Sequence, residues 1–341
     1  GEVQVTSLFA AIVDGGDTDP EIHAARAALY AQTGIGHAGD LRGGIETQTN
    51  GSTLALAAVA DRGDIQIHNS GALLIGTADG LSGVVILDSA NDNQGDNIVV
   101  TSAGPAEVVQ TVVNNDGGNI TLAAEGTAVT DDVDIDANVT AIGGNGNIRI
   151  YAGDSIDVDA AVTISAAGSG DVLLSASTDF NTGVPQNGYN GTAAEAGTAG
   201  RVVMQDGSIV QSQDGNITLR GDGDVLLSIV SANSNGDAHL GNVTVTADCA
   251  GVGPSMSDTS GAIIDNYDTG LGINVIGQLA TLSAATGIGS ANAIETAIVT
   301  LDAFNSTSGN IAIDEADAVD VNRLDQDGGG EVWLRAAGTI T

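Results

Sequence analysis

The sequence is short of several residue types on which most folded domains rely. Aromatic residues make up only 2% of the 341 positions, there is one cysteine, Cys249, and none of the 8 basic residues is a lysine. A globular core normally draws much of its buried area from Phe, Tyr and Trp, so a core of that kind is not expected. A single cysteine excludes an intrachain disulfide. The absence of lysine excludes a P-loop for phosphates.

Positive charge is scarce as well. The 44 acidic and 8 basic residues give a formal net charge of −36, which excludes a nucleic-acid-binding protein because no basic stripe exists to neutralise phosphates. The charge also disfavours binding to anionic lipid surfaces, and no apolar run approaches the ~20 residues of a membrane span. The acidic residues are spread along the chain, which indicates a hydrated exterior, a salty habitat or screening by divalent cations.

Glycine is abundant, with 49 residues, and it recurs in one phrase. The phrase is a glycine, usually a small polar residue, and then two apolar residues that flank a variable one. It begins at Gly118, Gly146, Gly170, Gly200, Gly215, Gly241, Gly309 and Gly330. A turn followed by a short β-strand, repeated every ~20–30 residues, is typical of a solenoid.

Residues 146–178 show the coil unit most clearly. Pairs of alternating apolar residues predict short strands with one face inward: Ile148 and Ile150, Ile156 and Val158, Val162 and Ile164, Val172 and Leu174. Three strands and three turns fill a coil of about 20–30 residues, and each strand runs parallel to its neighbour at ~4.8 Å. We therefore expect an all-β fold, a parallel β-helix, in which residues 1–341 form one elongated solenoid and a rod ~60 Å long.

Some segments depart from this period. Residues 20–30 are the one stretch with any helical period. Residues 88–96, 179–199 and 250–268 have no strand period, and we expect them to be loops that project from the corners of coils, because solenoids accept insertions on one edge.

A longer repeat lies above the coil repeat. Phrases that begin at Thr33, Ile45, Gly63 and Gly83 are followed, in the same order, by similar phrases from Thr286, Ile294, Gly309 and Gly330, at offsets of 253, 249, 246 and 247 residues. Residues 1–6 match residues 241–246 in the same way. Residues 1–240 are therefore expected to form about one module and residues 241–341 part of a second. Chance similarity among glycine-rich coils is the alternative.

The glycine phrase resembles the repeats of filamentous-haemagglutinin-like and other giant bacterial surface adhesins, as does the Thr-Gly-Ile-Gly … Ile-Glu-Thr phrase that occurs twice. The resemblance covers most of the chain and implies a right-handed parallel β-helix in a secreted, elongated stalk or fibre. It places the protein outside the cell, at the bacterial surface or in a biofilm matrix. The chain begins at Gly1 rather than Met, and we expect it to be a processed or excised part of a longer protein.

Acidic residues give the strongest local signal for a site. Asp132, Asp134 and Asp136 alternate with apolar residues, and Asp157 and Asp159 follow about one coil later. Stacking in register would bring Asp134 near Asp157 and Asp136 near Asp159, and like charges ~5 Å apart repel. A hard cation such as Ca²⁺ would relieve this repulsion. The alternative is that the carboxylates stay hydrated and splay apart.

Other reactive residues offer less. The four histidines, His23, His37, His68 and His239, share no metal-ligand spacing. Cys249 has no histidine partner nearby in the sequence and is expected to be a buried structural thiol. The Asn-x-Thr sequences at Asn119 and Asn242 fall inside the coil phrase, which favours a structural role over glycosylation.

Two classes of function remain open. The first is a structural or adhesive segment without enzymatic activity. Its coils would stack head to tail between subunits or onto flanking modules of a longer chain, and it would also contact a surface polysaccharide or a neighbouring cell.

The second is a carbohydrate-active β-helix enzyme, a lyase or hydrolase, which needs paired carboxylates beside a groove. Acidic pairs are too numerous to discriminate, but with Trp333 as the one tryptophan a sugar cleft has little aromatic support, so the first class is favoured.

Overall fold

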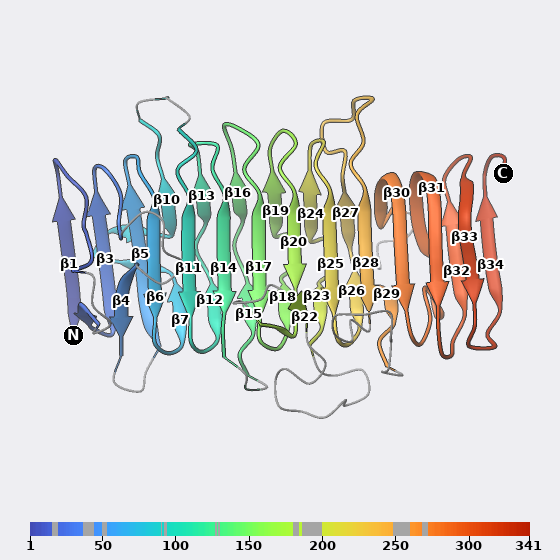
Figure 1. The fold of residues 1–341 in the computed structure, drawn as a ribbon, viewed down its shortest axis with the longest axis horizontal. Helices are drawn as coiled ribbons and strands as arrows, with labels where there is room; N and C mark the ends of the chain where they lie inside the picture. Colours follow the sequence, from blue (N-terminus) through green and yellow to red (C-terminus); the bar gives the residue numbers. More distant parts are fainter. Residues whose placement is uncertain are drawn as a thin grey trace.

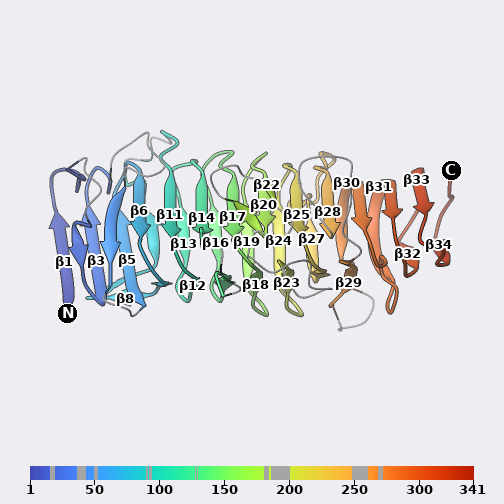
Figure 2. The same cartoon turned by 60° about the horizontal axis from the view of Figure 1, so that its bottom comes forward.

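The fold is a single parallel β-solenoid. The computed structural model describes residues 1–341 except 16–19, 37–43, 50–52, 90, 92–93, 127, 129, 180–183, 186–199, 248–259 and 268–271. The described chain contains no helix, hence none that could cross a bilayer, and 30 of its strands belong to one sheet. Figures 1 and 2 show these strands stacked along one axis, with the two termini at opposite ends of an elongated molecule. The predicted parallel β-helix is confirmed.

The middle of the rod has three columns of stacked strands, and each coil contributes one strand to each column. The first column consists of β6 (Ile65–Asn69), β11 (Ile98–Ser102), β14 (Ile120–Ala124), β17 (Ile148–Ala152), β20 (Val172–Ser175), β25 (Ile217–Gly221) and β28 (Val243–Ala247). The second consists of β7 (Leu73–Ile75), β12 (Ala106–Val108), β15 (Val133–Ile135), β18 (Ile156–Val158), β23 (Val202–Met204), β26 (Val225–Leu227) and β29 (Ile263–Asp265). The third consists of β10 (Val84–Ile86), β13 (Val112–Asn114), β16 (Val139–Ala141), β19 (Thr163–Ala166), β24 (Ile209–Ser212) and β27 (Ile229–Ser231).

Longer strands build the two ends of the rod. The N-terminal end contains β1 (Glu2–Ser7), β2 (Ile22–His23), β3 (Arg26–Ala31), β4 (Ile45–Gln48) and β5 (Leu54–Ala60). The C-terminal end contains β30 (Val275–Ala284), β31 (Ile294–Asn305), β32 (Ile311–Glu315), β33 (Asp320–Gln326) and β34 (Val332–Ala336). Two short antiparallel hairpins lie outside the main sheet: β8 (Thr77–Ala78) with β9 (Leu81–Ser82), and β21 (Thr178–Asp179) with β22 (Val184–Pro185).

The core is a narrow aliphatic column. Its buried cluster contains only Ala, Val, Leu and Ile side chains together with Met204. The paired apolar residues predicted for one coil are all buried, with Val162 the most accessible of them at 5%. By contrast, Phe9 and Trp333 lie on the surface. The solenoid therefore buries its apolar surface through many small side chains in parallel register, and this explains how the chain folds with so few aromatic residues.

Close packing of successive backbones explains why a glycine opens each phrase. Gly146, Gly170, Gly215 and Gly241 stack on one another at the entry to the first column. A Cβ atom at Gly170 would collide with the carbonyl oxygen of Gly146, and the same collision recurs at each step of the stack. Only glycine allows successive backbones to approach so closely at this corner.

The small polar residue after that glycine forms a ladder along the rod. The Oδ1 atom of Asn119 accepts the backbone N–H of Asn147 at 3.0 Å, and Asn147 in turn accepts from Asp171 at 2.8 Å. The two residues joined by each step of the ladder are 21, 22, 24, 26, 28, 33 or 45 residues apart in the sequence. Because the side chain binds the coil above it, insertions within a coil leave the stack intact.

The predicted pairs of phrases can be compared through strand register. Ile35 lies between Ile12 and Ile65, and Ile288 lies between Ile263 and Ile311 in the same arrangement. The next pair behaves alike, because Ile45 pairs with Ile67 and Ile294 pairs with Ile313. Residues 1–6 and 241–246 also correspond, since Val3 pairs with Ala27 as Val243 pairs with Ala280. The modules of residues 1–240 and 241–341 stay a prediction, and these registers favour it.

The two phrases of the fourth predicted pair, at Gly83 and Gly330, do not occupy equivalent positions in the solenoid. Val84, in the phrase at Gly83, pairs with Ala58 of β5. Val332, in the phrase at Gly330, pairs with Ile311 of β32. Ile311 is the counterpart of Ile65, and Ile65 pairs with Ile98. Val332 is therefore the counterpart of Ile98 and not of Val84. The inserted hairpin β8–β9 separates β7 from β10 and displaces the sequence alignment here.

Two expectations about local structure were wrong. Residues 20–30 are not helical: they form β2 and β3, because Ala27, Leu29 and Ala31 face the core while Ala28 lies under the β8–β9 hairpin. The segment 250–268, expected as a loop, contains β29, in which Ile263 pairs with Val225. Within residues 88–96, the described residues form no strand, as expected.

Candidate functional site

The predicted acidic residues lie on the outer face of the second column. Val133, Ile135, Ile156 and Val158 point into the core and are fully buried, so Asp134 and Asp157 point outward. Asp134 pairs with Asp157 in register, and Glu107 precedes both in the same row. We call this row, with Asp132, Asp136 and Asp159 beside it, the acidic ladder.

Crowding and partial burial in the acidic ladder disfavour the charged state. Burial raises the pKa of Asp132 to about 6, with the carboxylates of Asp154 and Asp134 adding to the effect. Burial, followed by the neighbouring carboxylates, also raises the pKa values of Asp134 and Asp136. The pKa of Asp157 is raised by burial, although a hydrogen bond from Gln205 at 3.1 Å offsets part of this rise. The ladder thus holds protons or counterions more strongly than isolated surface aspartates do.

A tighter acidic group lies elsewhere, and the sequence pattern did not reveal it. The carboxylate oxygens of Asp14, Glu21 and Glu46 lie within 4.8 Å of one another, and among the described residues this is the one set of three acidic or metal-binding side chains that does so. The ladder residues do not reach this proximity. The metal site predicted for Asp132, Asp134, Asp136, Asp157 and Asp159 therefore stays a prediction. Asp14, Glu21 and Glu46 each offer one carboxylate oxygen to a hard cation placed among them.

The group of Asp14, Glu21 and Glu46, which we call the acidic triad, is held by the backbone of β4. Glu21 Oε2 accepts the backbone N–H of Glu46 at 2.9 Å. The Oε2 atom of Glu46 is shielded from solvent and has no hydrogen-bond partner among the described residues. Burial and the carboxylates of Glu21 and Asp14 together raise the pKa of Glu46 to about 7. A proton on Glu46, shared with Glu21, relieves the repulsion within the triad.

The C-terminal end contains the counterpart of this triad with one change. Asp265, Asn274 and Glu295 occupy the equivalent register positions, and Asn274 Oδ1 accepts the N–H of Glu295 at 2.9 Å, as Glu21 does for Glu46. The amide also donates from Nδ2 to Asp265 Oδ1 at 2.7 Å, a bond that an ionised glutamate cannot make. The same backbone site thus exists in a form with three acidic side chains and in a form in which a neutral amide replaces one of them. The individual acids were visible in the sequence, but Glu21 is separated from Glu46 by 25 residues, and only the solenoid brings the triad together.

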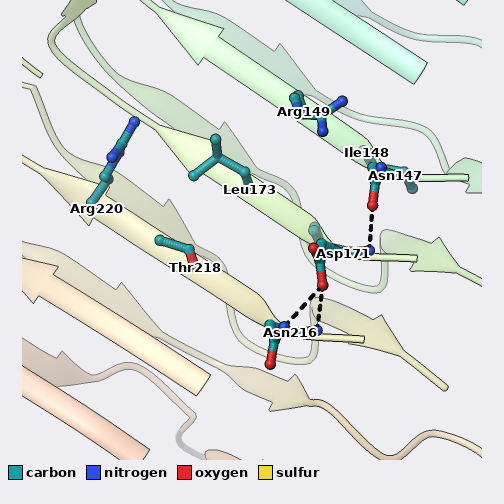
Figure 3. Close-up of a pocket in the computed structure, with 9 residues that line it drawn as sticks. Asn147, Ile148, Arg149, Asp171, Leu173, Asn216, Thr218 and Arg220 are labelled. Carbon is teal, nitrogen blue, oxygen red and sulfur yellow. Dashed lines mark hydrogen bonds between the residues drawn. The ribbon is translucent and has the colours of Figure 1, made fainter. Parts of the chain in front are cut away.

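A shallow groove lies on the outer face of the first column. Its volume is 340 Å³, and its floor and walls include Arg149, Leu173, Thr218 and Arg220. Register places Arg149, Leu173 and Thr218 on three successive coils. Figure 3 shows Arg149 level with Leu173 and Thr218 on the three strands, Arg220 further along the third strand, and the Asn147–Asp171–Asn216 part of the polar ladder at the opposite side of the groove. The apolar Leu173 side chain next to hydrogen-bond donors and acceptors is suited to a polar ligand with one apolar side.

The remaining candidates from the sequence have structural roles or fall outside the described residues. His68 Nδ1 lies 2.7 Å from Thr101 Oγ1, whereas His239 is exposed on a turn beside Asp237. The Nδ2 atom of Asn119 donates to Asn97 Oδ1 at 2.8 Å, so this amide is engaged in the polar ladder. Cys249 and His37 lie outside the described residues.

Comparisons of this chain with protein families, with curated proteins and with solved structures find no match. The geometry of the rod and of these three surface sites is therefore the basis for the functional proposal.

Proposed function

We propose that this chain is a structural and adhesive segment of an extracellular bacterial surface or matrix protein, acting through its length and lateral surface rather than through catalysis. The observation that carries the proposal is the parallel ladder, which links β1 to β34 in one sheet. Such a ladder gives a stiff rod because each coil hydrogen-bonds to its neighbours over most of its strands. A rod of this kind suits a part that holds other regions away from a surface.

The charge pattern supports an external, hydrated role. A net charge of −36 spread over the exterior keeps rods apart at low ionic strength and makes their close packing depend on salt or divalent cations. The acidic ladder and the acidic triad concentrate this effect at two places. We propose Ca²⁺ as a screening cation at these carboxylates, which have the hard oxygen ligands that it prefers.

The arginine-flanked groove is the part of the surface that we propose for adhesion. Arg149 makes no hydrogen bond or ion pair within the described chain, while Arg220 donates from Nε to Ser175 at 2.8 Å. A neutral polysaccharide could place an apolar sugar face on Leu173 and take hydrogen bonds from the arginines. An anionic polysaccharide would meet the repulsion of the whole rod.

The test combines imaging with a binding assay. Negative-stain images should show unbranched rods, and protein immobilised on beads should retain a neutral polysaccharide such as a glucan. The double variant Arg149→Gln/Arg220→Gln should lose most of this retention. Arg323→Gln is the matched control, because Arg323 already pairs with Asp302 at 2.7 Å far from the groove. Compact particles, or release of new reducing ends from the polysaccharide, would contradict the proposal, the latter in favour of an enzyme.

A further inference from the structure

The N-terminal end of the rod presents an uncovered strand edge with apolar residues behind it. The edge is formed by β1, Ile12 and β2, and we call it the N-terminal end face. Val3, Val5 and Ile12 pack against the core but stay partly accessible, because no described coil lies on their outer side. Val13, next to Ile12, is 60% exposed.

The molecule contains an internal counterpart of this end face. Ala25 donates its backbone N–H to the carbonyl of Gly1 at 2.9 Å, and Gln278 donates to Gly241 at 2.8 Å. Gly36 donates to Ile12 at 2.8 Å, and Gly289 donates to Ile263 at 2.9 Å. With the strand registers given above, these bonds make β1, Ile12 and β2 the counterparts of β28, Ile263 and the first residues of β30.

In the internal counterpart, the coil of residues 215–240 covers the equivalent edge. Ile217 donates its N–H to the carbonyl of Asn242 at 2.9 Å, Val225 donates to Ala262 at 2.9 Å and Val230 donates to Asn274 at 2.7 Å. The covered residues Val243, Val245, Ile263 and Val275 are all fully buried. The difference in exposure between the two edges thus comes from this one coil.

We infer that the N-terminal end face is a docking surface for a coil with the sequence pattern of residues 215–240. That coil has apolar side chains at the positions of Ile217, Leu219, Val225 and Val230, each of which is fully buried where it meets the internal counterpart. The carbonyl of Glu2 takes the place of the Asn242 carbonyl as acceptor for the first of its backbone bonds. The inference rests on the proposed function, because a docked coil would lengthen the rod that this function requires.

The same reasoning distinguishes this occupant from a second copy joined head to tail. The C-terminal end of the rod presents β33 and β34, where β34 is the counterpart of β11. In the middle of the rod β11 is covered by β14, which follows it in the chain. Head-to-tail contact between two copies would therefore set β33 and β34 against the N-terminal end face, where the internal pattern places β25, β26 and β27.

The test is an extended chain in which a copy of residues 215–240 is fused directly before Gly1 of the full protein. Hydrogen exchange should slow on the order of a hundredfold at the backbone amides of β1 and at the added coil, because both gain ladder partners. The first control carries Asp at the added copies of Ile217, Leu219, Val225 and Val230. The second carries residues 99–124 in place of 215–240, which supplies an equally long coil from the wrong position in the repeat.

Three outcomes would overturn the inference. In the first, exchange at β1 is unchanged in the extended chain while β28 keeps its protection, which shows a folded rod without docking. In the second, both controls protect β1 as well as the matched coil does. In the third, the unextended chain protects β1 by itself at high concentration, which identifies a second copy as the occupant. Images of single rods remain the separate test of the proposed function.

Discussion

Residues 1–102 and residues 241–336 build the same succession of coils but place acidic and amide side chains differently at equivalent positions. Glu21 at the N-terminal end is replaced by Asn274 at the C-terminal end, and both accept the same backbone N–H. One coil further the exchange is reversed. Thr47 donates to Asn69 at 3.1 Å, whereas Thr296 donates to the buried carboxylate of Glu315 at 2.6 Å. At both positions the coil needs a side-chain oxygen that accepts a hydrogen bond, and this oxygen can come from an amide or from a carboxylate.

The two regions also differ in one outer turn. Between β7 and β10 the N-terminal region carries the β8–β9 hairpin, whose Ala78 packs on Ala28 and Ala57. The C-terminal region runs through the equivalent place in the single strand β33, with a register shift against β31 between Leu301 and Asp302. Val84 and Leu324 pair with the equivalent residues Ala58 and Ala303, whereas the next inward position holds Ile86 in the N-terminal region and Gln326 in the C-terminal one. The coil thus tolerates an insertion on its surface while the inward and outward alternation is kept.

The largest effect is expected from cavities at matched core positions. Leu29 and Leu282 are both fully buried and are counterparts by register. Leu282→Ala should cost about 2–5 kcal/mol, and Leu29→Ala should fall at the lower end of this range because the end coil relaxes more easily. Denaturant unfolding with hydrogen exchange at β3 and β30 measures both. Equal losses would mean that the end coil is packed as rigidly as the interior one.

A smaller effect is expected from two equivalent glycines. Gly63 and Gly309 have φ angles of 81° and 82°, and a Cβ atom at either would collide with the carbonyl of Thr33 or Thr286. Alanine at either position should cost more than the about 1–2 kcal/mol of the left-handed backbone alone. Gly329→Ala is the matched control, because Gly329 has a φ of 76° with open space around it. Similar melting temperatures for all three variants would refute the collision.

The polar ladder should contribute about 1 kcal/mol per step. Asn147→Ala removes the acceptor of the Asp171 N–H at 2.8 Å, and Asn310→Ala removes the acceptor of the Glu331 N–H at 2.9 Å. The loss should be greater at Asn147, in the middle of the rod, than at Asn310, whose partner Glu331 belongs to the last described coil and relaxes more easily. Thermal unfolding of both variants tests the order, and a larger loss at Asn310 would reverse it.

The smallest effect on stability is expected from exchanging the triad residues, where the main change is in pH dependence. The folded pKa of Glu46, about 7, lies above its ordinary 4.5. The stability that this group contributes is therefore present below about pH 4.5 and is lost as the pH rises through about 7. Glu21→Asn should lower the pKa of Glu46, because the amide can donate to Asp14 as Asn274 does to Asp265, and should flatten this dependence.

The reciprocal variant sharpens the same comparison. Asn274→Glu should raise the pKa of Glu295 further, beyond the rise already caused by burial and by Asp265, and should introduce a loss of stability toward high pH at the C-terminal end. Carbon-13 titration of the glutamate carboxyl groups, followed separately in each variant, measures both shifts. A Glu46 titration that is unchanged in Glu21→Asn would show that Glu21 does not contribute to its raised pKa.

Much of the fold could be predicted from local sequence. The alternation of Ile148 with Ile150 and of Ile156 with Val158 placed these side chains in the core, and the stacking of Asp134 on Asp157 followed from coil spacing. Residues 20–30 were misjudged because the run of Ala27, Ala28 and Leu29 is compatible with a helix, and only the ladder between β1 and β5 selects a strand. The sequence does not reveal that Arg149 and Arg220 share a groove, because they lie two coils apart and sequence distance hides this relation.

The amino-acid sequence by itself determined the coil: where each strand turns, which side chains face inward and which glycines must have no Cβ atom. These are local matters, set by a period of two within strands and by the turn residues between them. The tertiary structure alone decided which coil positions meet, and with them the acidic triad and the amide that replaces Glu21 in its counterpart. Steps along the polar ladder vary from 21 to 45 residues, so lateral neighbours follow from hydrogen-bond register rather than from a fixed spacing along the chain.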